Sequence, residues 1–306
     1  MSKRADFDAL VELALEAEGY GQMRPVVEKE LLHYDILFAL DRSRLLDTLT
    51  FQGGTSLRLC HGSPRFSEDL DFVGGRDFDE ARMAALGECL TDYIGDRYGL
   101  PVEAKSPRPS SGKGSGDDIR VAKWQLSIVT APRRPDIPKQ RIKLEVANLP
   151  AYTREPQSLR LNYDFLPEGY ADLLVPTETL NEVLADKLIS LVNNERYVRH
   201  RDIWDLRWLA QRGASVEPEL LRRKIADYRV ARWSERARET AAKLPEIVQG
   251  RAFIEEMRRF LPAQAQARTL DRAGFGAFLA REVGETLTTA ANAIAPSAGE
   301  EQEFTL

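Results

Sequence analysis

The sequence predicts an α+β protein in two lobes, with a mixed sheet and flanking helices in the first lobe and helices alone in the second. Strand-like runs occur only before about residue 165, whereas apolar residues at three- and four-residue spacing dominate after it. The 306 residues suffice for two hydrophobic cores. We therefore expect a sheet domain over residues 1–165, a helical domain over 166–290 and a disordered tail over 291–306.

The elements of the first lobe follow from local patterns. "LTF" at 49–51 is typical of a short strand that stops at a double glycine, and "DLDFVGG" at 69–75 alternates as a strand does. An acidic first turn and a glycine stop mark the helix over 77–99. The other elements expected here are helices at 5–17, 26–40 and 55–61 and strands at 119–130 and 141–148.

The second lobe is predicted to contain helices only. They are expected at 177–194, 202–212, 217–230, 232–247, 251–260 and 271–286. In the first lobe, just before the strand expected at 119–130, "SPRPSSGKGSGDD" at 106–118 has the composition of a mobile loop.

Composition excludes several classes of protein. A hydrophobic content of 43% with 30% charged residues is typical of a globular chain, and no apolar run is long enough to cross a membrane. The N-terminus lacks the pattern of a secretory signal. Two cysteines form neither a disulfide framework nor a metal-binding cluster, so we expect a reduced, cytoplasmic protein.

The stretch "FQGGTSLRLCHGSPRFSEDLDF", 51–72, carries the first chemical signal. In a strand, Asp69 and Asp71 project from one face while Leu70 and Phe72 enter the core. Paired carboxylates without a nearby His or Cys favour Mg²⁺ or Mn²⁺ as the ion between them. The alternative is a surface strand with two solvated aspartates.

A double glycine precedes these carboxylates where a strand passes into a helix. Gly53 and Gly54 let the backbone approach a ligand closely, and the start of the helix offers free N–H groups to an anion. Thr55 and Ser56 add hydroxyl donors, or merely cap the helix. Fourteen residues before Asp69, the turn predicts a triphosphate site beside a metal site.

Three more residues complete the predicted chemistry. Glu145, on the strand at 141–148, is the candidate third carboxylate, for metal binding or for activating a hydroxyl; otherwise it belongs to a half-exposed strand. Lys187 lies within an apolar helix face, where it either extends outward or meets a buried anion. Asp202 is then expected close to Lys187, unless it is only a first-turn acid.

A basic stretch follows these residues. Residues 196–238 hold twelve basic and six acidic groups, which is compatible with phosphate binding. Arg196, Arg199 and Arg201 are the candidates for contacts with a nucleic-acid backbone, where affinity is mainly electrostatic. An ordinary solvated helix surface is the competing interpretation.

The glycine and Asp-x-Asp stretch, together with "LADKLISLVNNERYVRHRDIWDL" much later in the chain, resembles the AbiEii/AbiGii nucleotidyltransferases of toxin–antitoxin and abortive-infection (phage defence) systems. This family belongs to the DNA polymerase beta-like nucleotidyltransferase superfamily. The resemblance covers roughly residues 25–212 and implies a nucleotidyltransferase-type sheet domain beside a helical domain.

The resemblance also implies roles. Asp69 and Asp71 would be metal ligands, Gly53, Gly54 and Ser56 would hold phosphates, Lys187 would contact the phosphates, and Asp202 would complete the catalytic set. Arg65 and Ser67 lie within the motif, as further nucleotide-binding candidates. Ser67 is also a candidate for phosphorylation by an antitoxin, because negative charge there would block substrate entry.

The leading hypothesis is therefore a Mg²⁺-dependent enzyme that transfers nucleotides from an NTP to RNA, at the 3′ end of tRNA, and so blocks translation. One alternative is nucleotidyl transfer to a protein hydroxyl, and another is a non-catalytic nucleotide-binding or partner-binding module. A cognate antitoxin is an expected partner, whether or not it binds the protein directly, and a membrane is not.

Overall fold

The computed structural model describes residues 4–16, 19–107, 119–134, 136–194 and 196–295. The chain divides into two compact units. Unit 1 comprises Met1–Thr179 and Phe260–Gln266, and unit 2 comprises Leu180–Arg259 and Ala267–Leu306. The expected domain limit at residue 165 stays a prediction; the first compact unit includes a strand beyond it.

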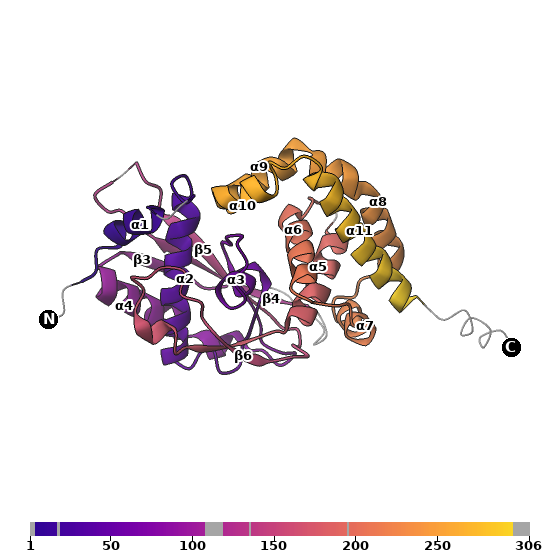
Figure 1. Cartoon of the computed structure of the whole chain (residues 1–306). Helices are drawn as coiled ribbons and strands as arrows, with labels where there is room; N and C mark the ends of the chain where they lie inside the picture. The colour runs from indigo at the N-terminus through magenta and orange to yellow at the C-terminus, as the bar shows by residue number, and fades with distance from the viewer. Residues whose placement is uncertain (1–3, 17–18, 108–118, 135, 195, 296–306) are drawn as a thin grey trace. The chain divides into compact units, whose positions relative to one another are not determined.

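Unit 1 is built around a seven-stranded mixed sheet in the order β3-β4-β5-β2-β1-β7-β6. Figure 1 labels β3, β4, β5 and β6 of this sheet. β2 runs parallel to β5 and antiparallel to β1, and β1 runs parallel to β7. The strands are β1 (Thr50–Gln52), β2 (Leu70–Val73), β3 (Val102–Lys105), β4 (Val121–Ile128), β5 (Gln140–Ala147), β6 (Glu155–Ser158) and β7 (Leu174–Thr177). The predicted α+β class with a mixed sheet is confirmed.

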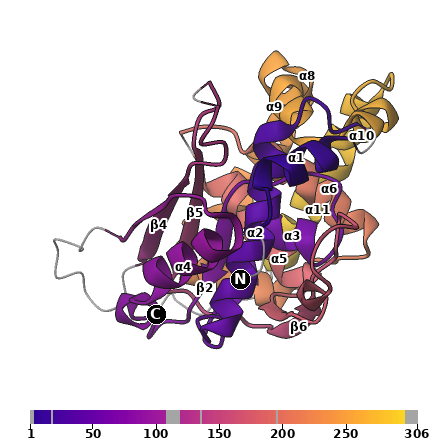
Figure 2. The ribbon, with the colours of Figure 1, turned by 90° about the vertical axis from the view of Figure 1, so that its left-hand side faces the viewer.

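Helices cover one face of this sheet. Figure 2 shows α2 (Arg24–Arg42) and α4 (Leu86–Tyr98) beside β4 and β5. β4 and β5 alternate buried and less buried residues until their last few positions, which are all buried, so one face of each strand enters the core below the helices. The remaining helical elements of this unit are α1 (Phe7–Leu15), α3 (Gly53–Leu59), η1 (Glu80–Met83) and η2 (Glu168–Tyr170).

The prediction that only helices follow residue 165 is wrong. β7 pairs with β1 and β6, and β3 and β6 were also not predicted. Each of the three strands has four residues, too few to show a period of two. Pro156 and Pro176 further disguise β6 and β7, because proline cannot donate to a strand ladder.

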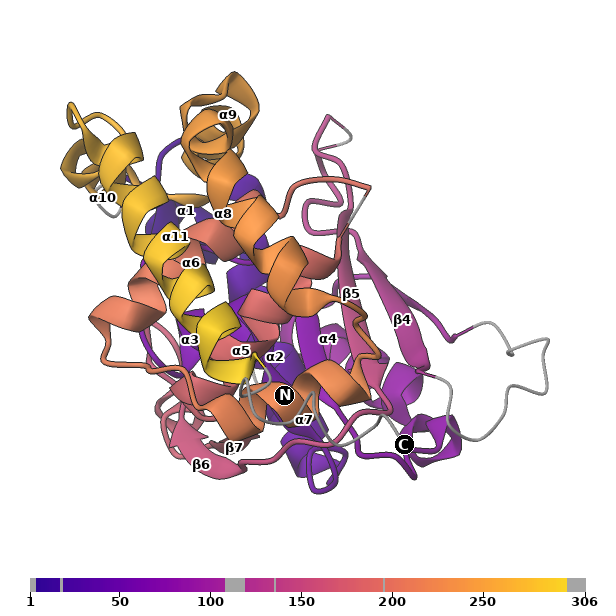
Figure 3. The same ribbon diagram turned by 90° about the vertical axis from the view of Figure 1, so that its right-hand side faces the viewer.

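Unit 2 is helical, as predicted. Figure 3 shows α8 (Trp233–Gln249) and α11 (Phe275–Ile294) side by side. Its other helices are α5 (Leu180–Asn193), α6 (His200–Gln211), α7 (Pro218–Asp227) and α9 (Arg251–Phe260), while the short α10 (Ala263–Arg268), which was not predicted, is shared with unit 1.

The C-terminal helix is longer than its predicted range. α11 continues to Ile294, so the first residues of the expected tail are helical. Residues 296–306 of that tail, and residues 108–118 of the expected mobile loop, lie outside the described residues. In the described part of the chain, no helix combines the length and apolar character needed to cross a membrane.

Candidate active site

The Asp-x-Asp motif lies at the start of β2, in the middle of the sheet. Leu70 and Phe72 are buried, and Phe72 stacks on Phe51 of β1 with ring centroids 5.0 Å apart. Strand alternation therefore directs Asp71 to the opposite face. Asp69 precedes the strand, is 31% exposed, and accepts a hydrogen bond from the backbone N–H of Lys143 at 3.1 Å.

The double-glycine turn is in direct contact with Asp71. Gly53 follows β1 and has φ +78°, a conformation that side-chain-bearing residues rarely adopt. A Cβ atom at Gly53 would lie only 2.6 Å from Oδ2 of Asp71. The missing side chain therefore lets the carboxylate lie against the turn. The turn at Gly53, predicted to bind phosphate, and Asp71, predicted to bind metal, therefore lie next to each other in unit 1.

Gly54 provides a second close approach. A Cβ atom there would lie 2.5 Å from Nη2 of Arg65 and 2.9 Å from Oγ of Ser67. Arg65 is only 2% exposed, and its Nη1 donates to the carbonyl oxygen of Phe66 at 2.7 Å. Both predicted nucleotide-binding side chains therefore pack against the turn, and the Arg65 guanidinium is buried there.

The two hydroxyls of the turn act on the chain itself. Thr55 donates to the backbone oxygen of Asp69 at 2.5 Å, and Ser56 donates to the backbone oxygen of Gly53 at 2.9 Å. Both side chains are buried. Thr55 therefore ties α3 to the start of β2, and Ser56 closes the turn, while phosphate binding by this turn stays a prediction.

Buried His33 of α2 adds a second tie to the same strand entry. Its Nε2 lies 3.0 Å from the backbone oxygen of Glu68, the residue before Asp69. Burial lowers the pKa of His33 to about 4, so the ring is neutral at physiological pH.

Glu145 is the register partner of Asp71 on the neighbouring strand β5. Its carboxylate is 23% exposed, and Nζ of Lys123 on β4 lies 3.1 Å away. Among the residues that the structure describes, no set of three or more His, Cys, Asp and Glu side chains is placed to hold a metal ion. Glu145 thus shares a sheet face with Asp71 without completing a three-ligand cluster.

Two lysines at this site were not predicted. Lys123 pairs with Glu145, and Nζ of Lys143 lies 3.6 Å from Oδ2 of Asp69. Alternation in "VAKWQLSI" and "RIKLEVAN" shows that both point away from the core. The sequence of one strand does not show which residue of its neighbour lies opposite. The pairing of each lysine with a carboxylate therefore could not be predicted from either strand alone.

In unit 2, Lys187 of α5 meets buried anions, which was one of the two expectations for it. Its Nζ lies 2.6 Å from Oδ1 of Asp202 and 3.0 Å from Oδ2 of Asp205, both on α6. Ser190 and Arg199 also donate to Asp202. Burial by itself would raise the pKa of Asp202, but Lys187 and Arg199 outweigh burial and hold that pKa below its usual range. Asp205 was not predicted as a member of this cluster.

The three arginines of the predicted nucleic-acid contact have different surroundings. Arg199 is held by Asp202, with Nε 2.6 Å from Oδ2, and Nε of Arg201 lies 3.4 Å from Oε1 of Glu256. Arg196 has an exposed side chain, and its backbone N–H donates to Asn194. Their role in nucleic-acid binding stays a prediction.

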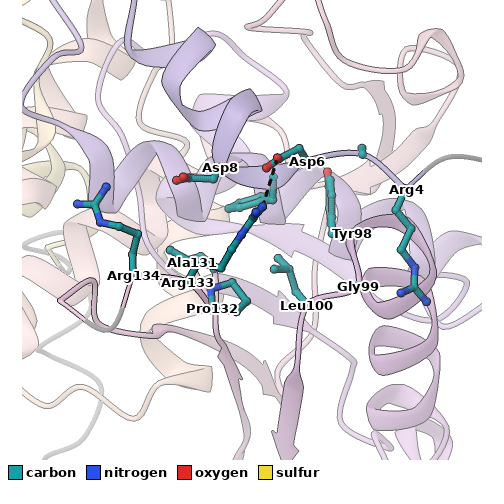
Figure 4. A pocket seen from close by; sticks show the side chains of 13 residues that line it. Arg4, Asp6, Asp8, Tyr98, Gly99, Leu100, Ala131, Pro132, Arg133 and Arg134 are labelled. Carbon is teal, nitrogen blue, oxygen red and sulfur yellow. Dashed lines mark ion pairs between the residues drawn. The ribbon is translucent and has the colours of Figure 1, made fainter.

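A cavity of about 330 Å³ lies elsewhere in unit 1 (Figure 4). Arg4, Arg133 and Arg134 lie around it, and Arg133 pairs with Asp6 at 3.9 Å. None of the predicted site residues lines this cavity, so it is not part of the candidate site.

Comparison with known proteins identifies the class. Residues 35–290 match the model of the family described as nucleotidyl transferase AbiEii toxin, type IV toxin–antitoxin system. The chain belongs to this family, and it is therefore a nucleotidyltransferase-family enzyme and a toxin-family protein. A search of curated proteins found no match.

Of two solved structures compared with this chain, only the first has a TM-score that supports a likeness in fold. The chain is similar to MenT4, a nucleotidyltransferase toxin from Mycobacterium tuberculosis, with 21% identity and a TM-score of 0.50 over 92% of this chain and 98% of that one. A putative nucleotidyltransferase from Helicobacter pylori matches with 17% identity and a TM-score of 0.48, over 88% and 96% of the two chains. At such identities the likeness concerns the fold alone.

Proposed function

We propose that the protein transfers nucleotides from an NTP to an RNA acceptor, at the 3′ end of tRNA, in a Mg²⁺-dependent reaction. The observation that carries the proposal is the contact between the Gly53 turn and the Asp71 carboxylate in a chain of this family. That contact joins the predicted triphosphate site to the predicted metal site within unit 1.

The residues present fit a magnesium ion. Mg²⁺ commonly takes one or two protein carboxylates and fills its other positions with water and substrate phosphates. Asp69 and Asp71 are hard oxygen donors near the start of one strand, and Oδ2 of Asp71 lies against the turn that follows β1. They would hold the ion, which would neutralise charge on the triphosphate when bound. The lack of a three-ligand protein cluster among the described residues is compatible with such a site.

The protein's own contribution is positioning. In the proposed reaction, the 3′ oxygen of the acceptor forms a bond to the α-phosphorus, the bond to the bridging oxygen breaks, and pyrophosphate leaves. We assign the proton of the attacking hydroxyl to Glu145, because it is the register partner of Asp71 on the next strand. Contact of Lys187 with phosphate and a catalytic role for Asp202 stay predictions.

Asp71→Asn tests the proposal. The substitution keeps the size of the side chain and removes its charge, so we expect folding to persist and transfer of labelled NTP to total tRNA to fall by at least about 100-fold. Wild-type activity should vanish with EDTA and return with excess Mg²⁺. Transfer to cell protein with none to RNA would instead establish the protein-acceptor alternative.

Lys143→Gln supplies a contrast at the same site. Lys143 approaches Asp69 but donates no metal ligand, so its loss should leave the requirement for Mg²⁺ intact. An Asp71→Asn protein as active as wild type would contradict the proposed chemistry.

A further inference from the structure

Within the described residues of unit 1, part of the outward face of the sheet is exposed at β3, β4 and β5. In β4 and β5 the buried positions pack with α2 and α4, and the alternate positions point away. Four cations lie on the outward face of β3, β4 and β5: Lys105, Lys123, Arg141 and Lys143. The three lysine side chains are 53–64% exposed. We call these four residues the basic face.

Strand register sets the basic face beside the candidate carboxylates. One row across the sheet runs from Asp71 on β2 through Glu145 on β5 to Lys123 on β4. The next row passes through Lys143 and Gln125 to Lys105 on β3. With about 4.8 Å between neighbouring strands, these rows carry positive charge roughly 5–15 Å outward from β2.

The order of the strands determines on which side of Asp71 the basic face lies. β1, which leads into the Gly53 turn, lies on one side of β2, and β5 and β4 lie on the other. If the triphosphate occupies the turn, the donor nucleotide lies on the β1 side of Asp71. The attacking group must come in line from the opposite side, which is the β5 side.

The acceptor that fits this side carries regularly spaced negative charges. Glu103 and Glu145 also lie on this surface and pair with Lys105 and Lys123, at 3.5 and 3.1 Å. These exposed pairs contribute little stability, so a phosphate replaces the carboxylate partner at small cost. A protein hydroxyl would draw no benefit from such a row of cations.

We propose that the basic face binds the phosphate backbone of the RNA acceptor and leads its 3′ end along β5 to Asp71. The proposal rests on the proposed function. It assigns the acceptor path to unit 1, in addition to the predicted contacts of Arg196, Arg199 and Arg201.

The double variant Lys105→Ala/Arg141→Ala tests this path. Neither residue contacts Asp69, Asp71 or Glu145 in the pairs above, and both are exposed, so the fold should persist. We expect KM for total tRNA to rise about tenfold, with KM for NTP unchanged. The slope of log Kd for fluorescently labelled tRNA against log salt should fall by about 2.

The matched control is Arg251→Ala/Arg281→Ala, which removes the same charge from exposed helix positions of unit 2, where the side chains are 89% and 60% exposed. This control should change KM and the salt slope little. If wild type labels no RNA, the proposed function fails. If wild type labels RNA but the basic-face variant behaves like the control, the acceptor path is wrong and the proposed function stands.

Discussion

Replacement of Gly53 by alanine is the sharpest test of the contact between the turn and the carboxylate. The new Cβ atom would lie 2.6 Å from Oδ2 of Asp71, about 0.8 Å closer than ordinary van der Waals contact. Asp71 must therefore move, or the turn must open. Either change separates the two halves of the proposed site.

The variant carries two separable costs. A residue with a side chain at φ +78° costs about 1–2 kcal/mol of folding free energy wherever it occurs. Displacement of a catalytic group by about 1 Å can cost roughly 100-fold in rate. Loss of stability is therefore expected to be modest, and loss of activity large.

Gly75 provides a matched control within unit 1. It has φ +81°, and an added Cβ would meet no atom within 4 Å. Gly75→Ala should therefore show only the loss of stability that the backbone conformation causes, about 2–4 °C in Tm per kcal/mol, while activity is retained. Thermal unfolding and labelled-NTP transfer to total tRNA measure the two effects on the same preparations.

Equal activity in the two alanine variants would refute this reasoning, provided that wild type is active. It would show that the position of the Asp71 carboxylate against Gly53 does not matter for the chemistry. Arrest of growth on expression gives a second measurement of the same contrast, because the family consists of toxins.

Three further predictions concern buried ionisable groups. Lys187→Met leaves the fully buried Asp205 without this cation, so we expect the free energy of unfolding, measured in urea, to fall by about 3–5 kcal/mol. Arg251→Met, at an exposed helix position, should lower it by less than about 0.5 kcal/mol, and equal urea midpoints for the two variants would contradict the prediction. Burial lowers the pKa of His33 to about 4, so its contribution to stability is present above pH 6.5 and lost as pH falls through 4, and His33→Gln should flatten that fall. Burial raises the pKa of Asp35 to about 6, so its contribution to stability is present below pH 3.8 and lost as pH rises through 6. Asp35→Asn should remove this dependence of stability on pH. If neither variant changes the pH profile of stability, the assignments to His33 and Asp35 are both wrong.

The long elements were readable from sequence because their patterns repeat. β4 and β5 alternate over eight residues each, and α5 shows its apolar face over fourteen. Four-residue strands such as β7 repeat too little, and their place depends on the neighbour with which they pair. Prolines in β6 and β7 removed the remaining local signal.

Some features of the candidate site were likewise predictable from the sequence, and others were not. The glycines, the Asp-x-Asp spacing and a lysine within an apolar helix face predicted which residue types to examine. The orientation of Asp69 toward Lys143, and the pairing of Glu145 with Lys123, came from register across three strands. Likewise, the hydrogen bond from the Ser56 hydroxyl to the backbone oxygen of Gly53 depends on local geometry, which composition does not reveal.

By itself, the sequence determined the α+β class, the helical second lobe and the motif that marks the family, because period and spacing are properties of one segment at a time. The tertiary structure decided that Gly53 touches Asp71, that Lys187 lies between Asp202 and Asp205, and that lysines flank the carboxylates on β4 and β5. Such contacts join residues from separate segments, and only the pairing of strands and the packing of helices bring those segments together.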